Sequence, residues 1–186
     1  MEKRIKGVKI KERKLPSILT EEEIFKLFGV SESERDRLIL KILYYTGLRN
    51  NEMIQLKKVD VNFKEKVIRI RAETTKTRRE DFQAIPKPLF DDLKKFCEYK
   101  QSEDRIIPLT KQRIWQLVKY YVKKAKIEKD IHPHSFRHTY GTHIYEKTND
   151  LGRVQELLRH SSIASTGIYK HLSKEAKQKT VDDVFK

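Results

Sequence analysis

The sequence contains a single cysteine and no long run of apolar residues. With only Cys97 present, the chain cannot form an intramolecular disulfide, and no paired-cysteine zinc motif is available. The apolar stretch over residues 38–45 is interrupted by Lys41 and is far shorter than the roughly 18 residues that span a bilayer. The charged N-terminus is followed by no apolar stretch and is therefore unlike a signal peptide. We expect a soluble, cytoplasmic protein with no membrane partner.

Acidic residues are scarce relative to basic ones. The chain has 42 Lys and Arg against 27 Asp and Glu, which gives a formal net charge of +15. Such an excess attracts polyanions, including nucleic acids. Lys- and Glu-rich surfaces are also typical of thermophilic proteins, but that composition adds both signs of charge and does not explain the imbalance. Charge alone therefore leaves nucleic-acid binding as one of two open interpretations.

Sequence periodicity predicts a mainly α-helical domain with a small three-stranded antiparallel sheet. Its length of 186 residues is sufficient to bury a hydrophobic core. Alternating apolar residues predict strands over residues 59–63, 67–70 and 82–85, and the polar segment 74–81 connects the last two. Capping residues and amphipathic spacing predict helices over residues 20–28, 32–46, 51–56, 89–96, 110–121, 133–146, 151–159, 162–170 and 174–184.

Three separated segments carry side chains suited to chemistry on a phosphodiester. They are TGLRNNEMIQL at 46–56, HPHSFRHT at 132–139 and LRHSSIASTGIY at 158–169. A phosphodiester resists attack because its oxygens are anionic, so an enzyme must neutralise the charge that builds on a five-coordinate phosphorus. Arginine is suited to this task because its guanidinium stays charged and bonds phosphate oxygens in pairs. Any single basic residue is by default a surface side chain, and only its position in these segments distinguishes it.

Together, and in this order, the three segments resemble the active-site boxes of the tyrosine recombinase and integrase family. The resemblance covers residues 18–186 and implies the fold of that family's catalytic domain. It implies a site-specific DNA recombinase that cuts and rejoins double-stranded DNA through a 3′-phosphotyrosyl bond, with no cofactor. The residues that it implies as catalytic are Arg49, Lys76, His134, Arg137, His160 and Tyr169.

Tyr169 is the nucleophile that the resemblance implies. A phenol with a pKa of about 10 is protonated at neutral pH, so it needs cationic surroundings and a proton acceptor. By resemblance, Arg49 and Arg137 bind the phosphate, His134 acts in proton transfer and His160 bonds a non-bridging oxygen. Packing within a helix is the structural alternative for any tyrosine, and we apply it to the other seven.

Lys76 lies in the basic turn between the second and third predicted strands. By resemblance it is the general acid for the leaving 5′-oxygen, a contribution of about 10²–10⁴ in rate. Arg78 and Arg79 lie in the same turn, so a simple phosphate contact is the alternative interpretation of Lys76. We expect Arg78, Arg79 and Lys14 to contact DNA.

Glu52 and Arg159 are the two remaining residues of interest in the boxes. Glu52 follows Arg49 by three residues, about one helical turn, where a carboxylate can orient the guanidinium. An ordinary exposed glutamate is the alternative. Arg159 stands where the family commonly has glycine, so we expect a slightly altered turn there.

Clustered histidines allow a zinc site as a further interpretation. Neither an HExxH spacing nor a cysteine pair accompanies them, so we expect no bound metal. By resemblance, His134 already has a role in proton transfer, and packing suits His138 in the second box. The four histidines are His132, His134, His138 and His143.

Residues 1–17 carry seven basic side chains and few large apolar ones, which indicates a basic arm or the remnant of an interdomain linker. The family usually has an N-terminal helical domain that closes around DNA, and we expect that domain to be absent here. We therefore expect a fragment or a minimal enzyme that binds DNA weakly and with strong salt dependence.

The resemblance implies a homo-tetramer on DNA, with residues 174–186 docking onto a neighbour, and allows a monomer off DNA. Two alternatives remain: a monomeric type IB topoisomerase-like enzyme, and a non-catalytic DNA-binding protein.

Overall fold

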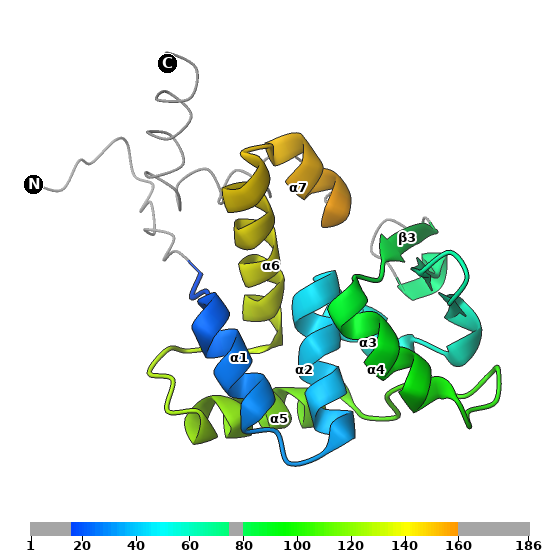
Figure 1. The fold of residues 1–186 in the computed structure, drawn as a ribbon, viewed down its shortest axis with the longest axis horizontal. Coiled ribbons are helices and arrows are strands. Elements are labelled where there is room, and N and C mark those ends of the chain that lie inside the picture. The colour runs from blue at the N-terminus through cyan, green and yellow to red at the C-terminus, as the bar shows by residue number, and fades with distance from the viewer. Residues whose placement is uncertain (1–15, 75–79, 160–186) are drawn as a thin grey trace, which may run out of the picture.

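In the computed structural model, residues 16–74 and 80–159 are described, and they form a mainly helical fold with a small sheet at one end (Figure 1). This confirms the predicted fold class. The predicted helices over 162–170 and 174–184, and most of the basic arm, lie outside the described residues. The elements are α1 Glu21–Gly29, α2 Glu34–Thr46, α3 Asn50–Gln55, η1 Lys58–Asp60, β1 Val61–Asn62, β2 Val67–Ile70, η2 Ala72–Thr74, β3 Asp81–Ala84, α4 Lys87–Cys97, α5 Lys111–Lys124, α6 Pro133–Thr148 and α7 Leu151–Leu157.

Local capping signals set where the helices begin. At the start of α1, the Glu23 amide donates to Thr20 Oγ1 over 3.2 Å and the Thr20 amide donates to Glu23 Oε2 over 2.8 Å, which is the predicted capping box. At the start of α2, the Ser33 side chain accepts the Asp36 amide over 3.1 Å. Pro133 occupies the first turn of α6, where its missing N–H leaves no helical bond unmade.

The sheet is antiparallel with the order β1-β2-β3, and Ile68 on the central strand pairs with Val61 on one side and Gln83 on the other. The predicted first strand over 59–63 is wrong in its bounds. Residues 58–60 form a 3₁₀ turn because the buried Asp60 carboxylate accepts the Lys57 amide over 3.0 Å, and β1 begins only after it.

Helix α2 lies at the centre of the core and packs against α1, α4, α5 and α6. Its fully buried side chains include Ile39, Ile42 and Leu43, which meet Phe136 of α6 in one continuous cluster. A second, smaller cluster of Tyr145, Val154 and Leu158 joins α6 to α7. Burial of this kind contributes about 1.5–3 kcal/mol per large apolar side chain. The two clusters fix the end of α2, the start of α6 and the end of α7 relative to one another.

None of the helices in the described ranges combines the length and the apolar character that a membrane span requires.

Candidate active site

Arg49 lies at the junction between α2 and α3. Gly47 follows the last residue of α2, and its φ of 58° is in the left-handed region that favours glycine. Arg49 is the residue immediately before α3. A Cβ on Gly47 would lie 2.7 Å from Cδ1 of Tyr140 and 3.2 Å from Leu158. The junction therefore packs directly against α6 and the end of α7, which requires a residue without a side chain.

Glu52 in α3 binds Arg49 at two points. The Arg49 amide donates to Glu52 Oε2 over 2.8 Å, and Arg49 Nη1 is 2.7 Å from Glu52 Oε1. The Glu52 side chain is fully buried, so it is not the exposed glutamate of the alternative interpretation. Burial alone would raise the pKa of Glu52, but the charge of Arg159 and the hydrogen bonds and charge of Arg49 outweigh burial and lower that pKa. Glu52 is thus an ionised carboxylate that holds Arg49 in place.

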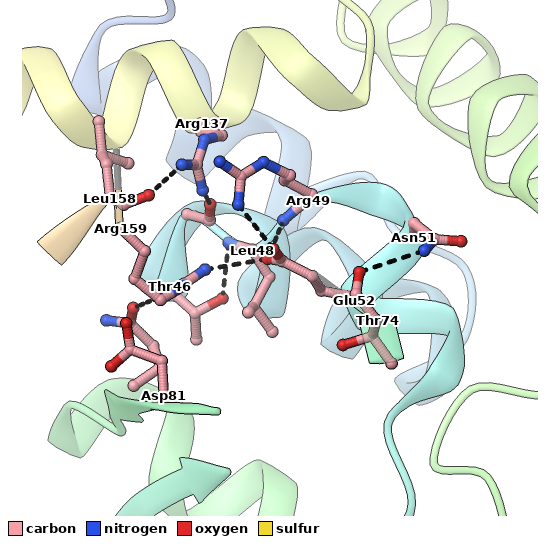
Figure 2. Close-up of polar contacts among 12 residues, drawn as sticks. Thr46, Leu48, Arg49, Asn51, Glu52, Thr74, Asp81, Arg137, Leu158 and Arg159 are labelled. Carbon is pink, nitrogen blue, oxygen red and sulfur yellow. Dashed lines mark hydrogen bonds and ion pairs between the residues drawn. The ribbon is translucent and has the colours of Figure 1, made fainter. Parts of the chain in front are cut away.

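Arg137 lies on α6 and is almost fully buried, with 2% of its surface exposed. Its Nη1 donates to the carbonyl of Gly47 over 2.6 Å, and its Nη2 donates to the carbonyl of Leu158 (Figure 2). A guanidinium has five N–H donors, so bonding two carbonyls does not prevent it from bonding a phosphate as well. Arg137 thereby joins all three sequence segments, and it contacts the chain two residues before Arg49.

His134 lies one helical turn before Arg137 and is exposed. Its ring packs edge-on against His138, with centroids 4.5 Å apart. His143 lies elsewhere on α6, where its Nδ1 is 3.0 Å from the hydroxyl of Tyr44 and burial lowers its pKa. Within residues 16–74 and 80–159, no three His, Cys, Asp or Glu side chains are grouped so that they could hold a metal ion.

Arg159, the last described residue, also contacts the side chains of this site, and the sequence did not predict that contact. Its side chain is only 6% exposed, and its Nη2 is 2.9 Å from Glu52 Oε2 (Figure 2). Its backbone has a φ of 52°. The expected alteration of a turn was the only signal in the sequence, because nothing local indicates that Arg159 reaches a carboxylate 107 positions earlier.

The turn between β2 and β3 begins beside α3. Asn51 Nδ2 donates to the Thr74 carbonyl over 3.4 Å. Buried Asp60 accepts two bonds from Arg71, at 2.8 and 2.6 Å, and one from Arg69 at 3.2 Å. These contacts hold the strand that leads into the turn. The predicted site residues that lie outside the described residues are Lys14, Lys76, Arg78, Arg79, His160 and Tyr169.

Comparison with known proteins adds independent evidence. Residues 17–176 match the model of the phage integrase family. This chain belongs to the phage integrase family. Within this family it is 34% identical over 185 residues to a tyrosine recombinase of Thermosipho africanus, an alignment that covers 94% of this chain and 63% of that protein. It is 36% identical to the tyrosine recombinase XerA of Pyrococcus furiosus, covering 87% of this chain and 61% of that protein.

Solved structures of integrase-family proteins share the fold. A XerA recombinase superposes with a TM-score of 0.79 at 26% identity, over 92% of this chain and 66% of that one. The catalytic domain of the bacteriophage HP1 integrase superposes with a TM-score of 0.69 at 24% identity, over 90% of this chain and 94% of that domain. XerH bound to difH substrate in a post-cleavage complex gives 0.74 at 24% identity, over 100% of this chain and 60% of that one. The chain spans about three fifths of the length of the curated relatives named above.

Proposed function

We propose that this chain is the catalytic part of a site-specific DNA recombinase that cuts and rejoins DNA through a phosphotyrosine bond. The observation that carries the proposal is that buried Arg137 donates to the carbonyls of Gly47 and Leu158, which joins it to the segment of Arg49 and to the start of the segment that leads to Tyr169. Membership of the phage integrase family and the naming of its relatives as tyrosine recombinases support it.

The proposed reaction is a pair of transesterifications. The Tyr169 oxygen attacks a DNA phosphorus, a P–O bond to Tyr169 forms, and the bond from phosphorus to the 5′-oxygen breaks. The leaving 5′-oxygen takes a proton from Lys76, while His134 accepts the proton of the phenol. In the second step a 5′-hydroxyl attacks the same phosphorus and releases Tyr169. Since one phosphoester replaces another at each step, the reaction as proposed uses no nucleotide or metal.

Charge stabilisation comes from the cationic side chains. As the phosphorus becomes five-coordinate, negative charge grows on its non-bridging oxygens, and guanidinium groups fixed beforehand stabilise that charge without reorganising. Arg49 and Arg137 have this role in the proposal, and His160 bonds one of the same oxygens. The low exposure of Arg137 and the carboxylate that holds Arg49 support it, because both side chains are held in place.

The substrate we propose is double-stranded DNA, contacted also by Lys14, Arg78 and Arg79, and the location we propose is the cytoplasm. The net charge of +15 and the solved complex of XerH with its difH substrate support DNA as the partner. We propose that residues 18–186 are the catalytic domain, that 1–17 are a basic arm or linker, and that four copies assemble on two duplexes through residues 174–186.

A nicked suicide duplex tests this function. The nick lets the short 5′-hydroxyl fragment diffuse away, so a covalent protein–DNA product accumulates. With duplexes of randomised sequence in EDTA, we expect an adduct that survives denaturation and that Tyr169→Phe abolishes. Tyr99→Phe is the matched control, because Tyr99 is 89% exposed, and it should form the adduct normally. No adduct with the unmodified protein, or an adduct that requires a divalent metal, would contradict the proposal.

A further inference from the structure

Arg159 occupies an unfavourable backbone conformation for an arginine. Its φ of 52° lies in the left-handed region, which costs a residue with a Cβ about 1–2 kcal/mol. Its side chain is also buried, so the guanidinium has lost most of its hydration. Glycine at this position would avoid both penalties. Costs of this kind are concentrated at functional sites, which directs attention to what the side chain contacts.

The contacts of Arg159 converge on Glu52. Glu52 Oε1 faces Arg49 Nη1 at 2.7 Å, whereas Oε2 accepts the Arg49 amide and lies 2.9 Å from Arg159 Nη2. In Figure 2 the two arginines reach this carboxylate from different sides. Arg159 therefore holds the oxygen that the Arg49 side chain does not use. With both oxygens engaged, the carboxylate has a single orientation, and so does the guanidinium bound to it.

A second contact fixes Arg159 itself. Its Nη1 donates to the side-chain oxygen of Gln83 on β3, and Gln83 Nε2 donates to the hydroxyl of Tyr140 on α6 over 3.3 Å. Gln83 is buried, with 2% of its surface exposed. Arg159 Nε is also buried and has no hydrogen-bond partner within residues 16–74 and 80–159. A buried donor without a partner costs about 1–3 kcal/mol, so among the described residues this is a third unfavourable contribution at Arg159.

The charge balance shows what Arg159 adds. The carboxylate of Glu52 cancels one positive charge beside Arg49 and Arg137, which leaves two guanidiniums with a net charge of one. Arg159 restores the second positive charge from a buried position. A phosphate that gains negative charge in the transition state is more strongly stabilised by the larger net charge, and this gain is greater in the transition state than in the bound substrate.

We propose that Arg159 is a positioning residue, which binds Glu52 and thereby holds Arg49 in the orientation that phosphate cleavage requires. This inference rests on the proposed function. Without Arg159, Glu52 pairs with Arg49 alone and draws that guanidinium and its charge away from the phosphate. The pKa of Glu52 then rises, because the charge of Arg159 is the largest of the influences that lower it.

Arg159→Gly is an informative substitution because glycine adopts the observed φ without strain. A loss of rate in this variant cannot be assigned to a distorted turn. Arg159→Lys keeps the charge but not the planar fork, and Arg153→Ala removes one exposed positive charge from α7 as the matched control. Single-turnover cleavage of the suicide duplex and DNA affinity are measured for each protein, with its thermal midpoint to confirm folding.

We expect Arg159→Gly to cleave at least about tenfold more slowly, since one lost oxyanion donor costs about 10²–10³ and Arg159 acts indirectly. Its DNA affinity should change no more than that of Arg153→Ala, and Arg159→Lys should recover part of the rate. Acidification should inhibit Arg159→Gly at a higher pH than the unmodified protein. In a Glu52→Gln background, Arg159→Gly should cause almost no further loss of rate, because both changes break one linkage.

Two results would overturn the inference. One is an Arg159→Gly protein that cleaves at the unmodified rate with an unchanged pH profile. The other is a pair of rate losses from Glu52→Gln and Arg159→Gly that simply multiply in the double variant. A failure of the proposed function is distinguishable from these two results. In that case the unmodified protein would give no adduct, whereas NMR titration would still show a higher pKa of the Glu52 carboxyl in Arg159→Gly than in the unmodified protein. That outcome would also end the role of Arg159 in cleavage.

Discussion

Among single residues, Glu52 has the most demanding environment. It is a fully buried carboxylate bound to two guanidiniums and one backbone amide. Removing one partner of a buried ion pair costs about 3–5 kcal/mol, because the remaining charge is left without compensation. The stability of the site and the orientation of Arg49 therefore depend on the ionisation of one side chain.

The stability of the protein should therefore depend on pH through Glu52. Its pKa is below the ordinary 4.5 in the folded protein and close to that value when unfolded. The ionised form thus stabilises the fold above about pH 4.5, and this contribution is lost as the pH falls through the folded-state pKa. Urea denaturation between about pH 7 and about pH 3 should show the stability difference between unmodified protein and Glu52→Gln shrinking at low pH. A difference that stays constant would contradict this account.

Gly47 gives a second prediction for a single residue. In Gly47→Ala, the new Cβ would lie 2.7 Å from the Tyr140 ring at a positive φ, so we expect a loss of about 1–2 kcal/mol from the backbone alone and more from the clash. Gly29→Ala is the matched control, because a Cβ there meets nothing within 4 Å and alanine is the better helix residue. Thermal denaturation should show the first variant destabilised and the second unchanged or stabilised; equal midpoints would be inconsistent with the packing described.

Among the elements, β2 depends on the buried Asp60 that precedes β1. This carboxylate accepts bonds from Arg69, Arg71 and the Lys57 amide, and these bonds outweigh the effect of burial and lower its pKa. We expect Asp60→Asn to lose about 3 kcal/mol, because two arginines lose their charged partner. Glu103→Gln removes an exposed ion pair with Lys57 and should leave the stability almost unchanged. Denaturation midpoints of the two variants that coincide would argue against a structural role for Asp60.

The sequence predicted the helix starts that nearby capping residues and prolines determine. The capping box at Thr20 and the proline at the start of α6 are each read within four residues of the helix start, and both are present. The start of β1 was misplaced because Asp60 folds back on Lys57 and binds Arg69 of β2 and Arg71, which follows that strand. In the candidate site, Arg49, Glu52 and Arg137 were predicted from their segments. The contacts of Arg159 were not predicted, because they join residues that are 76 and 107 positions apart in the sequence.

At the scale of the whole molecule, the main feature is the excess of positive charge. A net charge of +15 on 186 residues, if it serves to bind DNA, neutralises phosphates and releases counterions. Each phosphate contact contributes about −0.9 to the slope of log affinity against log salt concentration, so contacts with about five phosphates give a slope steeper than about −4. Fluorescence anisotropy with a labelled duplex over a salt series measures it. A slope near zero would mean that the excess charge does not contact the DNA backbone.

The central claim is that Tyr169 becomes covalently joined to DNA in a site formed by Arg49 and Arg137. Mass spectrometry of the trapped adduct tests it most directly, because trypsin cuts after Arg159 and Lys170 and releases peptide 160–170, in which Tyr169 is the sole tyrosine. After nuclease digestion, we predict that this peptide carries the nucleotide mass on Tyr169, and that Arg49→Ala and Arg137→Ala each prevent the adduct. A nucleotide found on Tyr140 or on any other residue, with peptide 160–170 unmodified, would contradict the claim.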